Sequence, residues 1–122
     1  MNGRPESVRD RLAETLRRGG GVTVPAVAVF ELSYGIAKSS NIAANMKKLD
    51  LFLSTLSILP FATIDAHAAA QIRADLERAG QPIGPYDCLI AGQAVRHGLT
   101  LVTANAREFA RVPGLAWENW AE

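Results

Sequence analysis

The sequence lacks several features that would assign it to a common class of protein. Among its 122 residues Cys88 is the only cysteine, which excludes an intrachain disulfide and a zinc site built on several thiolates. No apolar run reaches the length of a bilayer span, and charged residues interrupt the N-terminal segment "MNGRPESVRDRL", unlike a signal peptide. We therefore expect a cytoplasmic protein that makes no contact with a membrane.

The sequence also has no marked excess of positive or negative charge. Thirteen basic and twelve acidic residues nearly balance, so no overall positive field indicates nucleic-acid binding. Any such activity must depend on a local site.

Motifs of several common catalytic sites are absent as well. His67 and His97 are the only histidines and form no H-x-x-x-H pair, which argues against zinc, and His97 before Gly98 is interpreted as a C-terminal helix residue. There is no G-x-S-x-G, and the glycines at 19–21 lack the Lys-Ser/Thr of a phosphate-binding loop. Cys88, with apolar neighbours, is interpreted as a buried, inert thiol.

What is present is an alternation of strand-like and helix-like segments in one domain over residues 1–122. Nearly half of the residues are apolar, which suffices for a single core. Apolar spacing and glycine or proline boundaries predict helices from Pro5 to the glycines at 19–21, Pro25 to about Lys38, Ile42 to Leu56, Asp65 as N-cap to Ala79, Tyr86 to His97, and a short turn at Arg107–Phe109. Strands are predicted at Val22–Val24, Ile58–Ile64, Leu99–Thr103 and Leu115–Trp117.

This alternation favours an α/β fold with a parallel sheet covered by helices on both faces. In such sheets, polar residues near the carboxyl ends of the strands gather in one crevice. Five side chains occupy positions of that kind, namely Glu31, Asp87, Thr103, Asn105 and Glu108.

Each of these residues also has an ordinary structural interpretation. Glu31 can lie on the solvent edge of its helix, and Asp87 and Glu108 can act as first-turn acids that the helix dipole stabilises. Thr103 and Asn105 can be turn formers. Together, however, their oxygens suit a hard divalent cation, Mg²⁺ or Mn²⁺, that activates a water and stabilises the charge on a phosphodiester under attack. The combination indicates hydrolysis of a nucleic acid.

Three segments carry a family resemblance. They are "VFELSYGIAKS" around Glu31, "PIGPYDCLIAGQAVRHGLTLVTANAREFARVPGL" around Asp87, and the closing "WENW". With these segments the chain resembles the PIN-domain ribonucleases, and most closely the VapC-type toxins of bacterial toxin–antitoxin pairs. The resemblance extends over almost the whole chain from about Asn2.

The resemblance implies a PIN-like three-layer α/β/α fold with a mostly parallel central sheet. It also implies a magnesium- or manganese-dependent endoribonuclease toxin that cleaves RNA with a metal-activated water and is neutralised by a small VapB-like antitoxin. Carried onto this sequence, Glu31, Asp87 and Glu108 are the implied metal ligands. Asn105 matches the family's fourth position, and Thr103 supplies a hydroxyl that helps to orient the site.

The chain also departs from the family pattern. Members of the family open with a short central strand that ends in an Asp, and no such strand precedes Asn2. We expect a domain without its first strand and first acid. The alternative function is therefore a catalytically inactive PIN-like domain that only binds an antitoxin or dimerises.

A protein partner is expected on separate grounds. The predicted helical hairpin from Pro25 to Ser57 carries more apolar residues than one buried face needs, among them Tyr34, Ile36, Phe52 and Leu56. The alternative is that all of them belong to the core. An antitoxin or a second copy of the chain would cover this surface.

Overall fold

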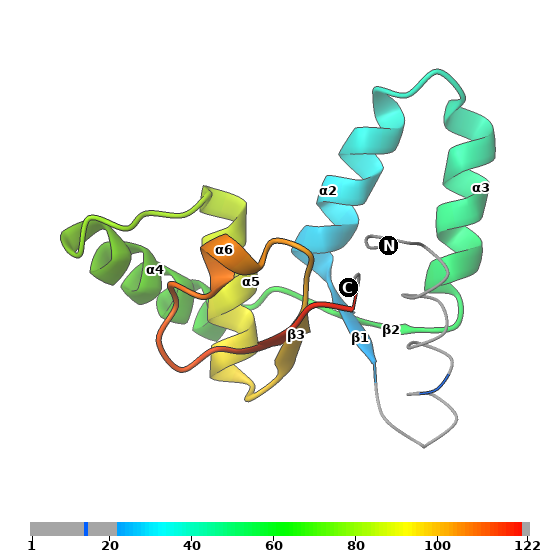
Figure 1. The fold of residues 1–122 in the computed structure, drawn as a ribbon. Helices are drawn as coiled ribbons and strands as arrows, with labels where there is room; N and C mark the ends of the chain where they lie inside the picture. The colour runs from blue at the N-terminus through cyan, green and yellow to red at the C-terminus, as the bar shows by residue number, and fades with distance from the viewer. Residues whose placement is uncertain (1–13, 15–21, 121–122) are drawn as a thin grey trace. The chain divides into compact units, whose positions relative to one another are not determined.

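A computed structural model describes residue 14 and residues 22–120 (Figure 1). The chain forms two compact units, one made by Val22–Phe61 and the other including the segment from Ala62 onward. We call them the hairpin unit and the α4–α5 unit and describe each by itself. The expected helix from Pro5 and the expected absence of a first strand lie outside the described residues.

The hairpin unit consists of two short strands joined by two helices. β1 (Thr23–Pro25) leads into α2 (Ala26–Ala37), and α3 (Ile42–Leu53) leads into β2 (Ser57–Leu59). The strands pair in parallel with Val24 opposite Ile58. Pro25 is the N-cap of α2, and its fixed φ suits the turn from strand to helix. Figure 1 shows α2 and α3 as the predicted helical hairpin.

The turn of this hairpin is stabilised by side chains at the end of α2. Asn41, the N-cap of α3, makes no side-chain capping bond. Ser39 Oγ instead donates to the carbonyl of Ile36 at 2.6 Å, and Asn45 Nδ2 donates to Ser39 Oγ at 3.1 Å. The serine thus stabilises the end of α2.

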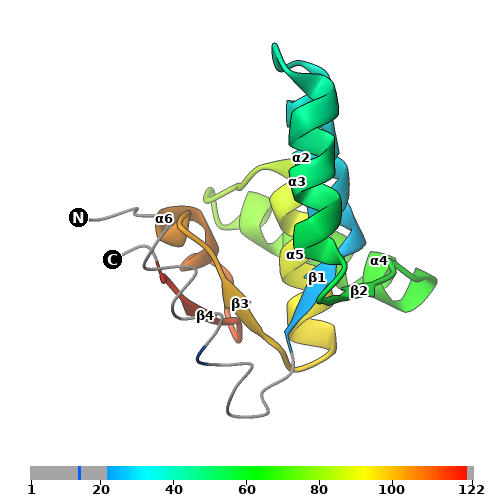
Figure 2. The same ribbon diagram turned by 90° about the vertical axis from the view of Figure 1, so that its right-hand side faces the viewer.

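The α4–α5 unit contains the remaining described elements. They are α4 (Thr63–Arg78), α5 (Pro85–Arg96), β3 (Thr100–Val102), α6 (Ala106–Phe109) and β4 (Ala116–Glu118). β3 and β4 lie side by side in Figure 2 and pair in parallel, with Leu101 opposite Trp117. Gly80 and Gly98 follow α4 and α5 with φ of 71° and 64°. This left-handed backbone conformation ends many helices, and glycine adopts it with less steric strain than other residues. These are the helix ends that the sequence predicted.

Most of the buried apolar side chains belong to this second unit. α4 and α5 pack closely because Gly92 faces Ala69: a Cβ added to Gly92 would lie 2.5 Å from the Ala69 Cα atom. Cys88 is buried, as predicted, and burial raises the pKa of its thiol. The buried apolar residues of the unit are Ala69, Leu76, Cys88, Ile90, Ala91, Ala94, Phe109, Val112 and Trp120.

The largest difference from the predicted bounds lies at β2 and the start of α4. The strand expected over Ile58–Ile64 ends at Leu59, directly before Pro60, which cannot donate a ladder hydrogen bond. α4 therefore begins at Thr63 with Ala62 as its N-cap, and Asp65 is not the N-cap that we predicted. The Asp65 carboxylate instead accepts a hydrogen bond from the Ala62 N–H at 2.8 Å, which is one half of a capping box.

Both pairs of strands are parallel, as expected for this class of α/β fold. Within residues 22–120 the hydrogen-bonded strand pairs are β1 with β2 and β3 with β4. Among the described residues, no helix has the length and hydropathy needed to cross a bilayer.

Candidate active site

Asp87 lies in the first turn of α5, directly after a loop rich in proline and glycine. Gly84 is the N-cap and Pro85 is the first helical residue, where its missing N–H costs no hydrogen bond. A carboxylate in this turn is stabilised by the free amides and by the helix dipole. The Asp87 side chain is half-buried, so it remains accessible from solvent.

Two further predicted residues come from the link between β3 and α6. The Asn105 N–H donates to Thr103 Oγ1 at 2.9 Å, which turns the chain out of the strand. Asn105 Nδ2 then approaches Asp87 Oδ2 at 3.4 Å. The structure thereby brings together Thr103, Asn105 and Asp87, and the threonine acts through the loop that carries Asn105.

Glu108, on α6, completes the group. The Gly84 N–H donates to Glu108 Oε1 at 3.0 Å. This bond is the main reason that the pKa of Glu108 lies below its ordinary value of 4.5; burial opposes the shift, and hydrogen bonds with Asn105 and Asp87 and the charge of Arg111 support it.

The two carboxyl groups flank Gly84 closely. A Cβ added to Gly84 would lie 3.4 Å from Asp87 Oδ2 and 3.9 Å from Glu108 Oε1. The absence of a side chain at this position therefore leaves the space beside both acids open. Sequence reasoning did not single out Gly84.

The donor chemistry of this group fits a hard divalent cation. Asp87, Glu108 and Asn105 offer only oxygen atoms and one amide nitrogen, and carboxylate and amide oxygens are the ligands that such a cation prefers. Over the described part of the chain, no cluster of three or more His, Cys, Asp or Glu side chains is close enough to hold a metal by itself. Further ligands would have to be waters, the substrate or another acid.

Glu31, the remaining predicted acid, belongs to the hairpin unit. It lies on α2, where its side chain is exposed. That position agrees with the solvent-edge interpretation, and its membership in the metal site stays a prediction.

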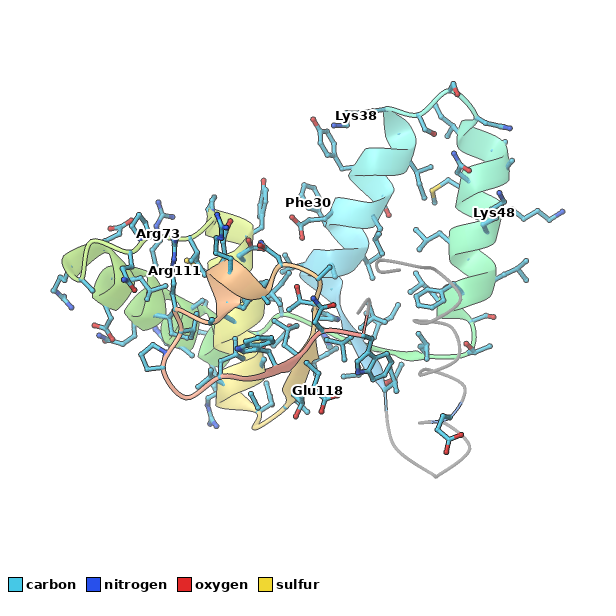
Figure 3. The ribbon with its side chains drawn as sticks, viewed as in Figure 1. Phe30, Lys38, Lys48, Arg73, Arg111 and Glu118 are labelled. Atoms are coloured by element: carbon cyan, nitrogen blue, oxygen red, sulfur yellow. The ribbon has the colours of Figure 1, made fainter. Side chains whose placement is uncertain are left out.

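One residue of the site escaped the sequence reasoning altogether. Arg111 Nη1 donates to the carbonyl of Pro82 at 2.8 Å, in the loop that leads to Asp87. The spacing of Glu108 and Arg111, which places both side chains on one face of a helical turn, was the signal that could have indicated it. Figure 3 labels Arg111 beside α6.

Comparison with known proteins assigns this arrangement to a class. The profile of the PIN domain matches residues 2–115, so the chain belongs to the PIN domain family. Its relatives within that family are VapC ribonucleases, as the resemblance implied.

The tRNA(fMet)-specific endonuclease VapC of Salmonella typhimurium is 39% identical over 120 residues, 98% of this chain and 89% of that protein. Ribonuclease VapC2 of Rickettsia felis is 38% identical with the same two coverages.

Solved structures agree. The DNA-bound VapBC complex of Salmonella typhimurium contains a chain that is 40% identical to this one, with a TM-score of 0.87, covering 95% of this chain and 86% of that one. The VapBC2 complex of Rickettsia felis, bound to a fragment of its promoter DNA, matches with a TM-score of 0.89 and 39% identity, at the same coverages. The PIN fold and a place among the nucleases are therefore established.

Proposed function

We propose that this protein is a magnesium- or manganese-dependent endoribonuclease toxin of a type II toxin–antitoxin pair. The observation that carries the proposal is the meeting of Asp87, Asn105 and Glu108 at the start of α5, in a chain whose relatives are VapC nucleases. Glu31 is proposed as a further metal ligand on the resemblance alone.

Each residue has a separate role in this proposal. Asp87, Glu108 and Glu31 would hold Mg²⁺ or Mn²⁺, which supplies an activated water and neutralises charge on the phosphodiester. Asn105 orients the Asp87 carboxylate through its side-chain amide, and Thr103 holds Asn105 in place through the backbone N–H. No side chain needs to act as a covalent nucleophile.

The substrate that we propose is a structured RNA of the transfer-RNA class. Relatives from Salmonella typhimurium and Shigella flexneri, at 39% and 40% identity, are named as tRNA(fMet)-specific endonucleases. The balanced overall charge of this chain agrees with recognition of a particular RNA shape rather than of any polyanion.

The test is RNA cleavage by the purified chain in Mg²⁺ or Mn²⁺, with chelator added as a control. Asp87→Asn should abolish cleavage and also reduce the thermal stabilisation that Mg²⁺ provides, because a neutral isostere binds the cation weakly. Asp50→Asn is the matched control, since Asp50 is an exposed acid on α3. Cleavage that survives Asp87→Asn would remove Asp87 from the site.

A VapB-like antitoxin is the proposed partner, with a homodimer as a second assembly. The structural neighbours from Salmonella and Rickettsia are toxin–antitoxin complexes. In the hairpin unit, α2 has no fully buried residue, and Phe30, Tyr34 and Leu51 are 51%, 57% and 66% exposed. An exposed apolar surface of this kind supports a protein interface.

The aromatic part of this surface is already ordered. The Phe30 and Tyr34 rings stack with centroids 6.4 Å apart, and Lys38 Nζ lies 4.5 Å from the Tyr34 centroid. Figure 3 shows Phe30 and Lys38 on the side of α2 that faces away from α3. Complex formation without any RNA cleavage by the wild-type chain would instead support the inactive, partner-binding alternative.

A further inference from the structure

The loop that leads into α5 is held by two side chains from one short segment. Arg111 Nη1 donates to the Pro82 carbonyl at 2.8 Å, and Glu108 Oε1 accepts from the Gly84 N–H at 3.0 Å. We call Glu108 and Arg111, with the backbone of Pro82–Gly84 between them, the loop clamp. It holds one acceptor and one donor of the loop backbone, two residues apart.

The two ends of the loop are held by backbone hydrogen bonds of the helices. At its start the Gln81 N–H donates to the Leu76 carbonyl at 2.9 Å, across Gly80. At its end the Cys88 N–H donates to the Gly84 carbonyl at 3.0 Å, which begins α5. Pro82 has no N–H, so its carbonyl is the only backbone group through which that residue can be held.

The backbone that carries the two clamp side chains is held by buried neighbours and by a hydrogen bond. Phe109 and Val112, which alternate with the clamp residues along the chain, are 3% and 4% exposed. The Arg111 N–H donates to the Glu108 carbonyl at 3.1 Å, so both side chains extend from one hydrogen-bonded turn of the backbone. Buried neighbours and a closed turn restrict how far either side chain can move with its backbone.

The position of Asp87 depends on this loop, because Asp87 lies one helical turn after Gly84. A displacement of the loop would shift the first turn of α5 and with it the Asp87 carboxylate. The distance of 3.4 Å between Asn105 Nδ2 and Asp87 Oδ2 is already near the upper limit for a hydrogen bond, so a small shift would break this contact. Misplacement of a reacting group by about 1 Å costs on the order of 100-fold in rate.

We propose that Arg111 is a positioning residue of the ribonuclease site: by holding the Pro82 carbonyl it fixes the start of α5 and the place of the Asp87 carboxylate. The inference rests on the proposed function and assigns Arg111 no contact with substrate. Its guanidinium also stands near Glu108, so the geometric role must be separated from a purely electrostatic one.

Three substitutions and one control make that separation. Arg111→Met removes both the donor and the charge, Arg111→Gln keeps a donor without the charge, and Arg111→Lys keeps both. Arg107→Met is the control, since Arg107 lies on α6 four residues before Arg111, is exposed, and makes no side-chain hydrogen bond or ion pair with the described residues. Arg107→Met also removes one positive charge but leaves the hydrogen bond between Arg111 and the Pro82 carbonyl in place.

Steady-state RNA cleavage, measured over a range of RNA concentrations, gives the first readout. Arg111→Met should lower kcat by about 10- to 100-fold with little change in KM, because it displaces a reacting group without removing an RNA contact. Arg111→Lys should recover most of kcat and Arg111→Gln part of it, whereas Arg107→Met should leave kcat unchanged. A kcat for Arg111→Met equal to that of Arg107→Met would overturn the proposal.

Amide hydrogen exchange of Gly84 and Cys88, followed by NMR, gives a second readout that needs no activity. Arg111→Met should speed exchange at both amides by at least about tenfold while the thermal midpoint changes little, and Arg111→Lys should restore slow exchange. Unchanged exchange would refute the clamp. If the wild-type chain cleaves no RNA, the proposed function fails, and this exchange measurement alone decides whether Arg111 holds the loop.

Discussion

His97 Nε2, at the end of α5, lies 2.7 Å from Asp65 Oδ1, near the start of α4. The Asp65 side chain is only 1% exposed and accepts two more hydrogen bonds, from the Ala62 N–H at 2.8 Å and from Gln93 Nε2 at 3.2 Å. Because an ionised carboxylate only accepts, the His97 nitrogen carries the proton in this contact. One buried carboxylate thus joins the N-terminus of α4 to Gln93 of α5 and to the C-cap His97 that follows it.

The first prediction concerns this carboxylate. Asp65→Ala should lower the free energy of unfolding by about 2–3 kcal/mol, since it leaves buried donors without their acceptor. Asp75→Ala, on the exposed face of the same helix, removes an ion pair with Arg78 and should cost about 0.5 kcal/mol or less. Urea denaturation followed by circular dichroism measures both. Equal losses in the two variants would show that Asp65 has no special role.

The second prediction is the pH dependence that follows from the same residue. The Ala62 N–H, with His97 and Gln93, holds the pKa of Asp65 below its ordinary value of 3.8, although burial opposes the shift. A lowered pKa means that the unfolded chain binds the proton first as pH falls. The stabilisation is therefore complete above about pH 5 and is lost as pH falls through the folded-state pKa.

Asp65→Asn isolates this effect, because Glu108 also has a lowered pKa and adds a slope of the same sign. The difference in unfolding free energy between the wild type and Asp65→Asn should be constant above pH 5 and should shrink in more acid solution. A difference that stays constant down to pH 2.5 would contradict the assigned pKa shift.

The third prediction concerns the close approach of α4 and α5. Gly92→Ala should destabilise the protein by about 1–3 kcal/mol, since the added methyl group would overlap the Ala69 backbone. Gly35→Ala is the control: Gly35 lies inside α2 with open space around its Cα atom, and alanine there should stabilise the helix by about 0.5–1 kcal/mol. Opposite signs for the two variants in thermal unfolding are the expected outcome.

The fourth prediction concerns the exposed aromatic surface of α2. Tyr34→Ala should weaken binding of the proposed antitoxin by about 2 kcal/mol or more, while the stability of the isolated chain changes little because the ring is exposed. Ile64→Ala, at a position that is 40% exposed on α4, is the control and should bind as the wild type does. Co-purification and calorimetry with the product of the adjacent gene measure the effect, and equal affinity of the two variants would place the interface elsewhere.

Much of the fold was predictable because its signals are local. Glycine at 80 and 98 and proline at 25 and 85 mark helix boundaries, and apolar spacing marks the helices between them. The predicted strand over Ile58–Ile64 runs through Pro60, but the observed strand ends before this proline. As a result, the predicted start of α4 was too late and Asp65 is not its N-cap.

The candidate site was predictable only in part. Asp87, Thr103, Asn105 and Glu108 were found because each follows a strand or opens a helix, positions that converge in parallel α/β folds. Arg111 and Gly84 were missed, since each pairs with a group distant in the sequence: Arg111 with the Pro82 carbonyl and the Gly84 N–H with the Glu108 carboxylate. The pairing of Asp65 with His97 and the approach of Gly92 to Ala69 depend in the same way on how α4 packs against α5, which a single sequence does not specify.

The uneven distribution of buried side chains has a consequence for how the molecule opens. Within residues 22–120, Leu49 is the only apolar side chain of the hairpin unit that is fully buried, whereas nine are buried in the α4–α5 unit. Segments with few buried contacts unfold locally at lower free energy. Local unfolding should therefore expose the amides of α2 and α3 more often than those of α4 and α5, so they should exchange faster. A protease acting on the native chain would then cut first between Val22 and Phe61, and a partner bound to the hairpin would protect it most.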